Sequence, residues 1–251
     1  METLNVRSVE EIPSEDYKRM LLTLMDRQAG REVATAEVFG QCILHAPTVD
    51  DKIRLTRFQN EELKHFKLVA KLMDELGVDL DEYERSRKKA GTRFTGNPED
   101  IRVEDWLDAT LFNFMIDRAA TFQLTEYTRG SYEPFARANK AILKDEEGHR
   151  DFGEACLVEM CKDPKKRAEI ERRFKKWFIA ALRIFGRPGT PGNRYCVEVG
   201  LKDRDSGEIA AAYLDSIRPV MERCGLHFPK REELPLDLPP QLDLHVAENA
   251  A

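Results

Sequence analysis

The feature that most constrains this chain is a Glu-x-x-His spacing that occurs twice, at Glu62–His65 and at Glu146–His149. On an α-helix, residues three apart lie on the same face, one turn from each other. A carboxylate oxygen and an imidazole nitrogen placed in this way can bind one metal ion together. Chance often produces a single such pair in an acidic, helical chain, so the interpretation depends on matching carboxylates elsewhere.

The composition fits a helical globular protein and restricts its partners. The 251 residues suffice for one large domain or two small ones, and the 34% of charged residues fit long helices with solvated outer faces. The net charge of −6 argues against nucleic acid or an anionic membrane as the main partner. No apolar run approaches the roughly 18 residues needed to span a bilayer, and Met1–Glu11 contains no signal-peptide core.

The cysteines indicate the compartment. There are five, they are widely scattered, and none forms a Cys-x-x-Cys pair. This usage is typical of reduced thiols. We therefore expect a cytoplasmic protein without disulfides.

Four apolar stripes with a helical period predict an all-α core. They cover residues 14–46, 48–76, 103–130 and 134–161. A connection over 79–101, with a short helical piece at 81–89, suits a crossover between two helix pairs.

Beyond the core, the sequence predicts two further helices, one from Asp163-Pro164 to about Phe185 and one over 206–224, separated by a Gly/Pro loop at 186–193. The domain boundaries follow from these elements. They are a loose leader at 1–13, one domain at 14–228 and a Pro-rich, extended or partly disordered tail at 229–251.

Polar residues interrupt the four core stripes at matched places. They are Glu32, Glu62, His65, Asp117, Glu146 and His149. Each half of the chain supplies a helix with one carboxylate and then a helix with a carboxylate and a histidine. Four buried carboxylates are costly without cations, and this ligand set suits two iron or manganese ions in a helix bundle. The alternative for each residue is a surface acid or a core histidine.

Other acids and histidines are predicted to lie outside the ligand set. Three acids fall on outer or lateral helix faces: Glu37, Glu61 and Glu147. Glu126 points to the opposite side from Asp117, whereas Glu154 is a candidate for supporting a ligand from behind. The histidines predicted not to bind metal are His45, His227 and His245.

Three runs of sequence resemble the phenylacetic acid catabolic family. They are Phe114–Ala120 (FMIDRAA), Arg129–Arg137 (RGSYEPFAR) and Lys144–His149 (KDEEGH). The resemblance extends over about residues 15–230. By this resemblance the six residues that interrupt the stripes carry over one by one as metal ligands, with the four carboxylates at the catalytic centre.

The resemblance implies a ferritin-like four-helix bundle with additional C-terminal helices and a di-iron centre that activates O₂. It further implies a monooxygenase that epoxidises the aromatic ring of a CoA thioester, with electrons from NAD(P)H through a separate reductase. The family also includes a metal-free relative that serves as a structural partner. Because this chain keeps the ligands, we expect the catalytic type, associated with such a partner or with itself.

Alternatives remain open for the activity and the substrate site. A ferritin-like ferroxidase, or a stand-alone di-iron oxygenase acting on another substrate, would use the same ligands. Candidate pocket walls, with plain core as the alternative, are Phe39, Phe58, Phe114 and Ile142. Basic residues that suit a CoA phosphate, or simply a solvated face, are Lys64, Lys67, Arg87, Lys88 and Arg93.

Overall fold

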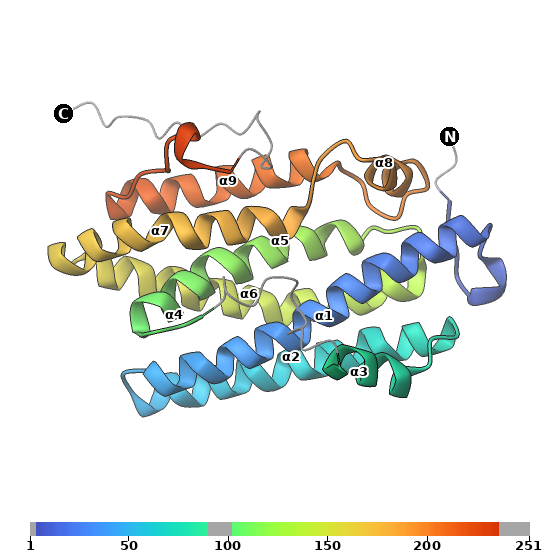
Figure 1. Cartoon of the computed structure of the whole chain (residues 1–251), viewed down its shortest axis with the longest axis horizontal. Helices are drawn as coiled ribbons and strands as arrows, with labels where there is room; N and C mark the ends of the chain where they lie inside the picture. The colour runs from blue at the N-terminus through green and yellow to red at the C-terminus, as the bar shows by residue number, and fades with distance from the viewer. Residues whose placement is uncertain (1–3, 90–101, 236–251) are drawn as a thin grey trace. The chain divides into compact units, whose positions relative to one another are not determined.

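The computed structural model describes residues 4–89 and 102–235, and these residues are helical, without a strand (Figure 1). The prediction of an all-α fold is confirmed. The helices are α1 (Glu15–His45), α2 (Val49–Glu75), α3 (Leu80–Lys89), α4 (Trp106–Phe112), the π-helical turn η3 (Asn113–Asp117), α5 (Arg118–Tyr127), α6 (Glu133–Cys161), α7 (Pro164–Phe185), α8 (Pro191–Glu198) and α9 (Ser206–Cys224).

Three of the four predicted core helices, α1, α2 and α6, begin and end within one residue of the prediction. Side-chain caps explain the sharp starts, because the Ser14 and Thr48 hydroxyls accept hydrogen bonds from the backbone N–H groups of Tyr17 and Asp51 at 3.1 Å. The fourth, predicted as one helix over 103–130, is divided into α4, η3 and α5. The long, apolar pattern that predicts a helix does not show the extra residue of a π turn.

Two other segments differ from the prediction. The loop predicted at 186–193 ends early, because α8 begins at Pro191, and proline suits a first helical position where no N–H is needed. Near the N-terminus, Val6 in the predicted leader is buried and exchanges backbone hydrogen bonds of 2.8 Å with Ser131 and Glu133. The parts of the predicted connection at 90–101 and of the tail at 236–251 lie outside the described residues.

The described chain divides into two compact units. The first contains residues up to 106 together with 125–145 and 195–203. The second contains 107–124, 146–194 and 204 onward. The long helix α6 contributes to both, with the division between Asp145 and Glu146.

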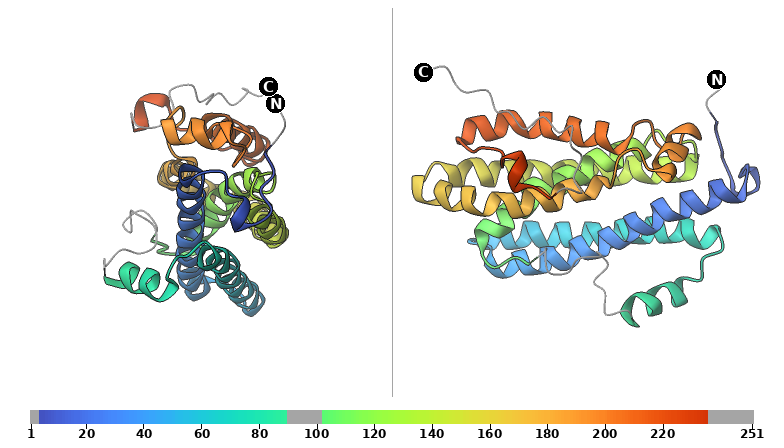
Figure 2. Two further views of the ribbon diagram at one scale, coloured as in Figure 1. Left: turned by 90° about the vertical axis from the view of Figure 1, so that its right-hand side faces the viewer. Right: turned by 45° about the horizontal axis from the view of Figure 1, so that its top comes forward.

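In the first unit, α1 and α2 lie side by side and run in opposite directions (Figures 1 and 2). Phe39 and Phe58 pack with ring centroids 5.7 Å apart. Polar side chains of α2 also cap the carbonyls of α1: Lys52 Nζ donates to Ile43 O at 2.8 Å, and Gln59 Nε2 donates to Ala36 O at 2.9 Å. These contacts fix the register of the two helices, in which Glu32 of α1 faces Glu62 and His65 of α2.

In the second unit, η3 is held by side chains of other helices. The Tyr213 hydroxyl of α9 donates to the Met115 carbonyl at 3.3 Å. Gly153 of α6 approaches η3 so closely that a Cβ there would lie 2.4 Å from the Asn113 carbonyl carbon. Only glycine permits this approach, so the π turn and Gly153 depend on each other.

Replacing Gly153 by alanine should therefore destabilise the metal-free protein by about 3 kcal/mol, because the new methyl group collides with backbone. Gly148→Ala on the same helix is the matched control. Its Cβ meets no atom within 4 Å, so the higher helix propensity of alanine should raise the free energy of unfolding by about 0.5–1 kcal/mol. Urea denaturation of both variants measures the two effects, and equal stabilities would contradict the close packing.

Candidate metal centre

The first unit brings three of the predicted ligands together. His65 Nδ1 lies 3.5 Å from Glu32 Oε2 and 3.9 Å from Glu62 Oε2. All three side chains are buried. Glu32 comes from the middle of α1, while Glu62 and His65 lie one turn apart on the inner side of α2, so the helix hairpin itself assembles this half of the site.

Burial makes this group of charges unfavourable without a cation. Desolvation raises the pKa of Glu32 to about 8, and the neighbouring Glu62 carboxylate adds to the rise, although the hydrogen bond with His65 opposes it. Gln28 Nε2 donates to Glu32 Oε1 at 3.0 Å, but a neutral amide does not compensate a buried charge. Carboxylate and imidazole donors around one buried point fit a divalent metal ion.

The other nitrogen of His65 has a partner that the sequence analysis did not assign. His65 Nε2 lies 3.1 Å from Asp145 Oδ2. In the neutral tautomer in which Nε2–H donates to this carboxylate, Nδ1 carries the lone pair and faces Glu32 and Glu62, as a metal ligand requires. Metal-binding histidines commonly have this arrangement, with a carboxylate fixing the tautomer. The signal in the sequence is the aspartate directly before Glu146.

Glu146 is the next residue of α6 after Asp145 and the first residue of this stretch of the second unit. Its side chain is buried as well.

Asp117 and His149, the two remaining predicted ligands, belong to the second unit. Both are buried, and Asp117 is the last residue of η3. His149 Nδ1 lies 3.6 Å from Glu146 Oε2, one turn away on α6. Their role as ligands stays a prediction.

Glu154 contacts two arginines of the second unit. Its carboxylate pairs with Arg118 and, at 2.5 Å, with Arg223 Nη2 of α9. Partial burial alone would raise the pKa of Glu154, but the two guanidinium groups lower it. Arg118 directly follows Asp117 and also donates to Ser216 O at 3.4 Å. Glu154 therefore anchors the residue next to a predicted ligand.

The acids and histidines predicted to lie outside the ligand set have mixed environments. Glu37 and Glu147 are exposed as predicted, and Glu61 pairs with Arg57 at 3.4 Å. Glu126, in contrast, is buried, so the side of α5 opposite Asp117 is not a solvent face. His227 is exposed beside Glu171, His45 is partly exposed, and His245 lies outside the described residues.

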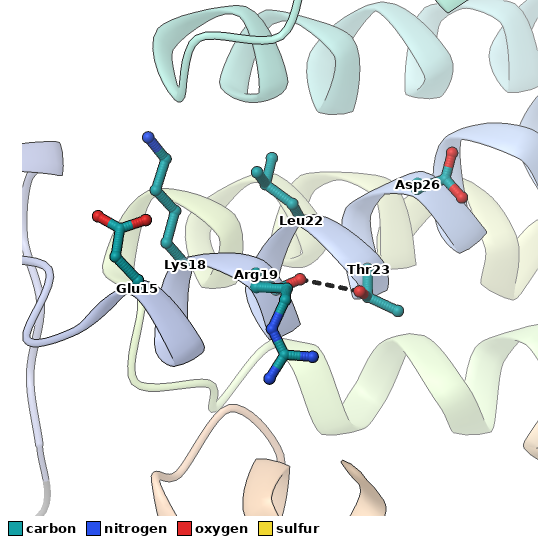
Figure 3. Close-up of a pocket in the computed structure, with 6 residues that line it drawn as sticks. All are labelled: Glu15, Lys18, Arg19, Leu22, Thr23 and Asp26. Atoms are coloured by element: carbon teal, nitrogen blue, oxygen red, sulfur yellow. Dashed lines mark hydrogen bonds between the residues drawn. The ribbon is translucent and has the colours of Figure 1, made fainter.

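The predicted pocket walls are all buried, which fits core as well as pocket: Phe39, Phe58, Phe114 and Ile142. Figure 3 shows a different feature, an open pocket of about 400 Å³ on the surface of α1. Its lining is Glu15, Lys18, Arg19, Leu22, Thr23 and Asp26. It contains none of the predicted ligands and is not a candidate for the metal centre.

Comparison with known proteins identifies the family. The family model described as phenylacetic acid catabolic protein matches residues 5–237. The chain belongs to this family. The 1,2-phenylacetyl-CoA epoxidase of Escherichia coli (strain K12) has one subunit that is 23% identical over 220 residues, which are 85% of this chain and 70% of that protein. Benzoyl-CoA oxygenase component B from Aromatoleum evansii is 28% identical over 155 residues, 59% of this chain and 33% of that protein.

The pKa of Glu32 predicts how the stability of the metal-free protein changes with pH. As the pH rises from 4.5 through about 8, the unfolded chain releases a proton that folded Glu32 keeps, so the free energy of unfolding should fall by a few kcal/mol. Glu32→Gln should reduce this fall, whereas Glu37→Gln, which changes an exposed acid of the same helix, should not. Denaturation curves measured across this pH range test the prediction. If the free energy of unfolding changes equally with pH in wild type and both variants, the burial of Glu32 is contradicted.

Proposed function

We propose that this protein is the metal-bearing subunit of an O₂-dependent di-iron oxygenase that acts on an aromatic CoA thioester. Six residues would hold the two metal ions: Glu32, Glu62, His65, Asp117, Glu146 and His149. The observation that carries the proposal is the buried group of two carboxylates and one imidazole, Glu32, Glu62 and His65, with Asp145 behind His65. The alternative predicted from the sequence, a ferroxidase, would need the same ligands but no organic substrate.

The residues of the chain have defined tasks in this proposal. Bound iron would supply the redox chemistry that activates O₂. Glu32 and Glu62 would neutralise the metal charge, and Asp145 would keep the His65 lone pair directed at the metal. The apolar residues packed around these side chains would exclude water, which strengthens every charge interaction at the centre.

The substrate class rests on the names of the relatives. One is an epoxidase of phenylacetyl-CoA and the other an oxygenase of benzoyl-CoA. Both names specify an aromatic acid joined to CoA, and both describe one part of a larger enzyme. We extend the thioester class and the need for protein partners to this chain. No described helix is long and apolar enough to cross a membrane. The five cysteines form no disulfide, which fits the predicted cytoplasmic location.

The ligand assignment predicts that His149→Ala lowers the iron content. Loss of one imidazole should reduce occupancy from two ions per chain towards one, while apolar contacts preserve the fold. His227→Ala is the control, since His227 is exposed and pairs with Glu171, away from the predicted ligands. Iron per chain is measured after anaerobic Fe²⁺ loading and desalting, with circular dichroism as the check of folding. If His149→Ala still binds two irons per chain, His149 is not a metal ligand.

The hydrogen bond between Asp145 and His65 predicts a smaller effect on metal binding than the loss of a ligand. Asp145→Asn should lower metal affinity by about 10–100-fold, because the imidazole loses the carboxylate that orients it. Asp151→Asn changes an exposed aspartate of the same helix and should leave affinity unchanged. Competition with a coloured chelator measures both, and equal affinities would show that Asp145 does not support the metal.

Activity distinguishes an oxygenase from a ferroxidase. With an artificial electron donor, iron-loaded protein should consume O₂ faster when phenylacetyl-CoA or benzoyl-CoA is present, and mass spectrometry should find one added oxygen atom in the product. Rapid Fe²⁺ oxidation without any response to either thioester would favour the ferroxidase and contradict the proposal.

A further inference from the structure

One surface of the first unit is unusually apolar. Among the described residues, the exposed large hydrophobic side chains are Leu4, Leu44, Val49, Ile53, Leu63 and Leu68. All but Leu4 lie at the end of α1 or on α2. The exposed fractions are highest where the two helices meet: 76% at Leu44, 71% at Val49 and 63% at Ile53. Apolar side chains gathered in this way on a surface commonly mark an interaction site.

The middle of the same helix is basic, although α2 as a whole has six basic and six acidic residues and the protein is acidic. Between Lys52 and Lys71, α2 carries six lysines and arginines but only two acids, Glu61 and the buried Glu62, whereas the whole chain has a net charge of −6. Successive outward positions are three or four residues apart, so their side chains form one stripe. We call this stripe the α2 outer face; it consists of Ile53, Arg57, Asn60, Lys64, Lys67 and Lys71, all exposed.

The α2 outer face lies directly behind the candidate metal centre. Glu62 and His65 are on the buried side of the helix turns whose exposed side carries Lys64 and Lys67. An α-helix with its side chains is about 10–12 Å thick. A molecule bound to this face would therefore be separated from His65 by little more than one helix.

A protein fits this face better than the CoA phosphate considered from the sequence. The exposed side of a single helix is convex, whereas sites for small molecules are concave. The side chains of Arg87 and Lys88 are not described, and Arg93 lies outside the described residues. Lysines beside the exposed Leu63 and Leu68 have the composition of a docking surface for an acidic partner.

We propose that the α2 outer face docks an acidic electron-transfer protein. This inference rests on the proposed function. Inserting one atom of O₂ into a substrate and reducing the other to water consumes two electrons and two protons beyond those of the substrate. The family resemblance implies that a separate reductase delivers these electrons. The α2 outer face combines a charge complementary to an acidic carrier with proximity to the proposed metal ligands.

Binding of a plant-type [2Fe–2S] ferredoxin, an acidic one-electron carrier, tests the proposal with full-length, iron-loaded protein. Wild type should bind it at about 20 mM salt and lose most of the affinity at about 200 mM. Lys64→Glu/Lys67→Glu should weaken binding at low salt by about tenfold or more. Lys165→Glu/Lys166→Glu reverses two exposed lysines at the start of α7, changes the net charge equally and should bind within about twofold of wild type.

Carbodiimide cross-linking followed by peptide mapping locates the contact, and should join ferredoxin carboxylates to Lys64 or Lys67. Absence of salt-sensitive binding by wild type, or equal loss in both charge-reversed variants, would overturn the proposal. So would a change in oligomeric mass in Lys64→Glu/Lys67→Glu alone, which would assign the face to a second copy of the chain. Because binding and iron content are separate readouts, a protein that binds two irons but fails these tests refutes only the docking site.

Discussion

The burial of Glu32 and Glu62 against His65 is the interaction on which the first unit depends. Two carboxylates in an apolar hairpin repel each other, and burial raises the pKa of Glu32 to about 8. Such a group is stable in an otherwise apolar helix interface only if another interaction offsets the free-energy cost of burying the charges. The surrounding contacts hold it without neutralising it: Gln28 supports Glu32, and Asp145 orients His65. In the proposed function, a bound cation would supply the missing charge and would tie folding to metal binding.

In the second unit, side chains from other helices support Asp117, a predicted ligand. Asp117 ends a π-helical turn, and such turns cost stability unless neighbours fix them. Here Gly153 allows α6 to approach the turn, and Tyr213 bonds to the Met115 carbonyl. Arg118, next in sequence, is held by Glu154 and Ser216. The helix α9 thus helps to fix the π-helical turn in place, in addition to packing against the core.

The sequence predicts those features that are local and periodic. Apolar stripes locate α1, α2 and α6 to within a residue, helped by side-chain caps at α1 and α2. The polar interruptions identify the buried Glu32, Glu62, His65 and Glu146. Features that arise from tertiary contact were missed. The π turn requires the space left by Gly153, the role of Asp145 requires a residue 80 positions away, and the position of Val6 requires Ser131. The burial of Glu126 was missed because helical angle alone does not tell which sides of a helix are covered.

The measurement that tests the central claim most directly is Mössbauer spectroscopy of the protein loaded with ⁵⁷Fe under anaerobic conditions and then oxidised. Two carboxylate-held irons in one buried site should give a ferric pair that is magnetically coupled and therefore diamagnetic at low temperature. The account predicts that signal for most of the iron, at two ions per chain. Isolated, magnetically uncoupled ferric ions, or no retained iron, would contradict it.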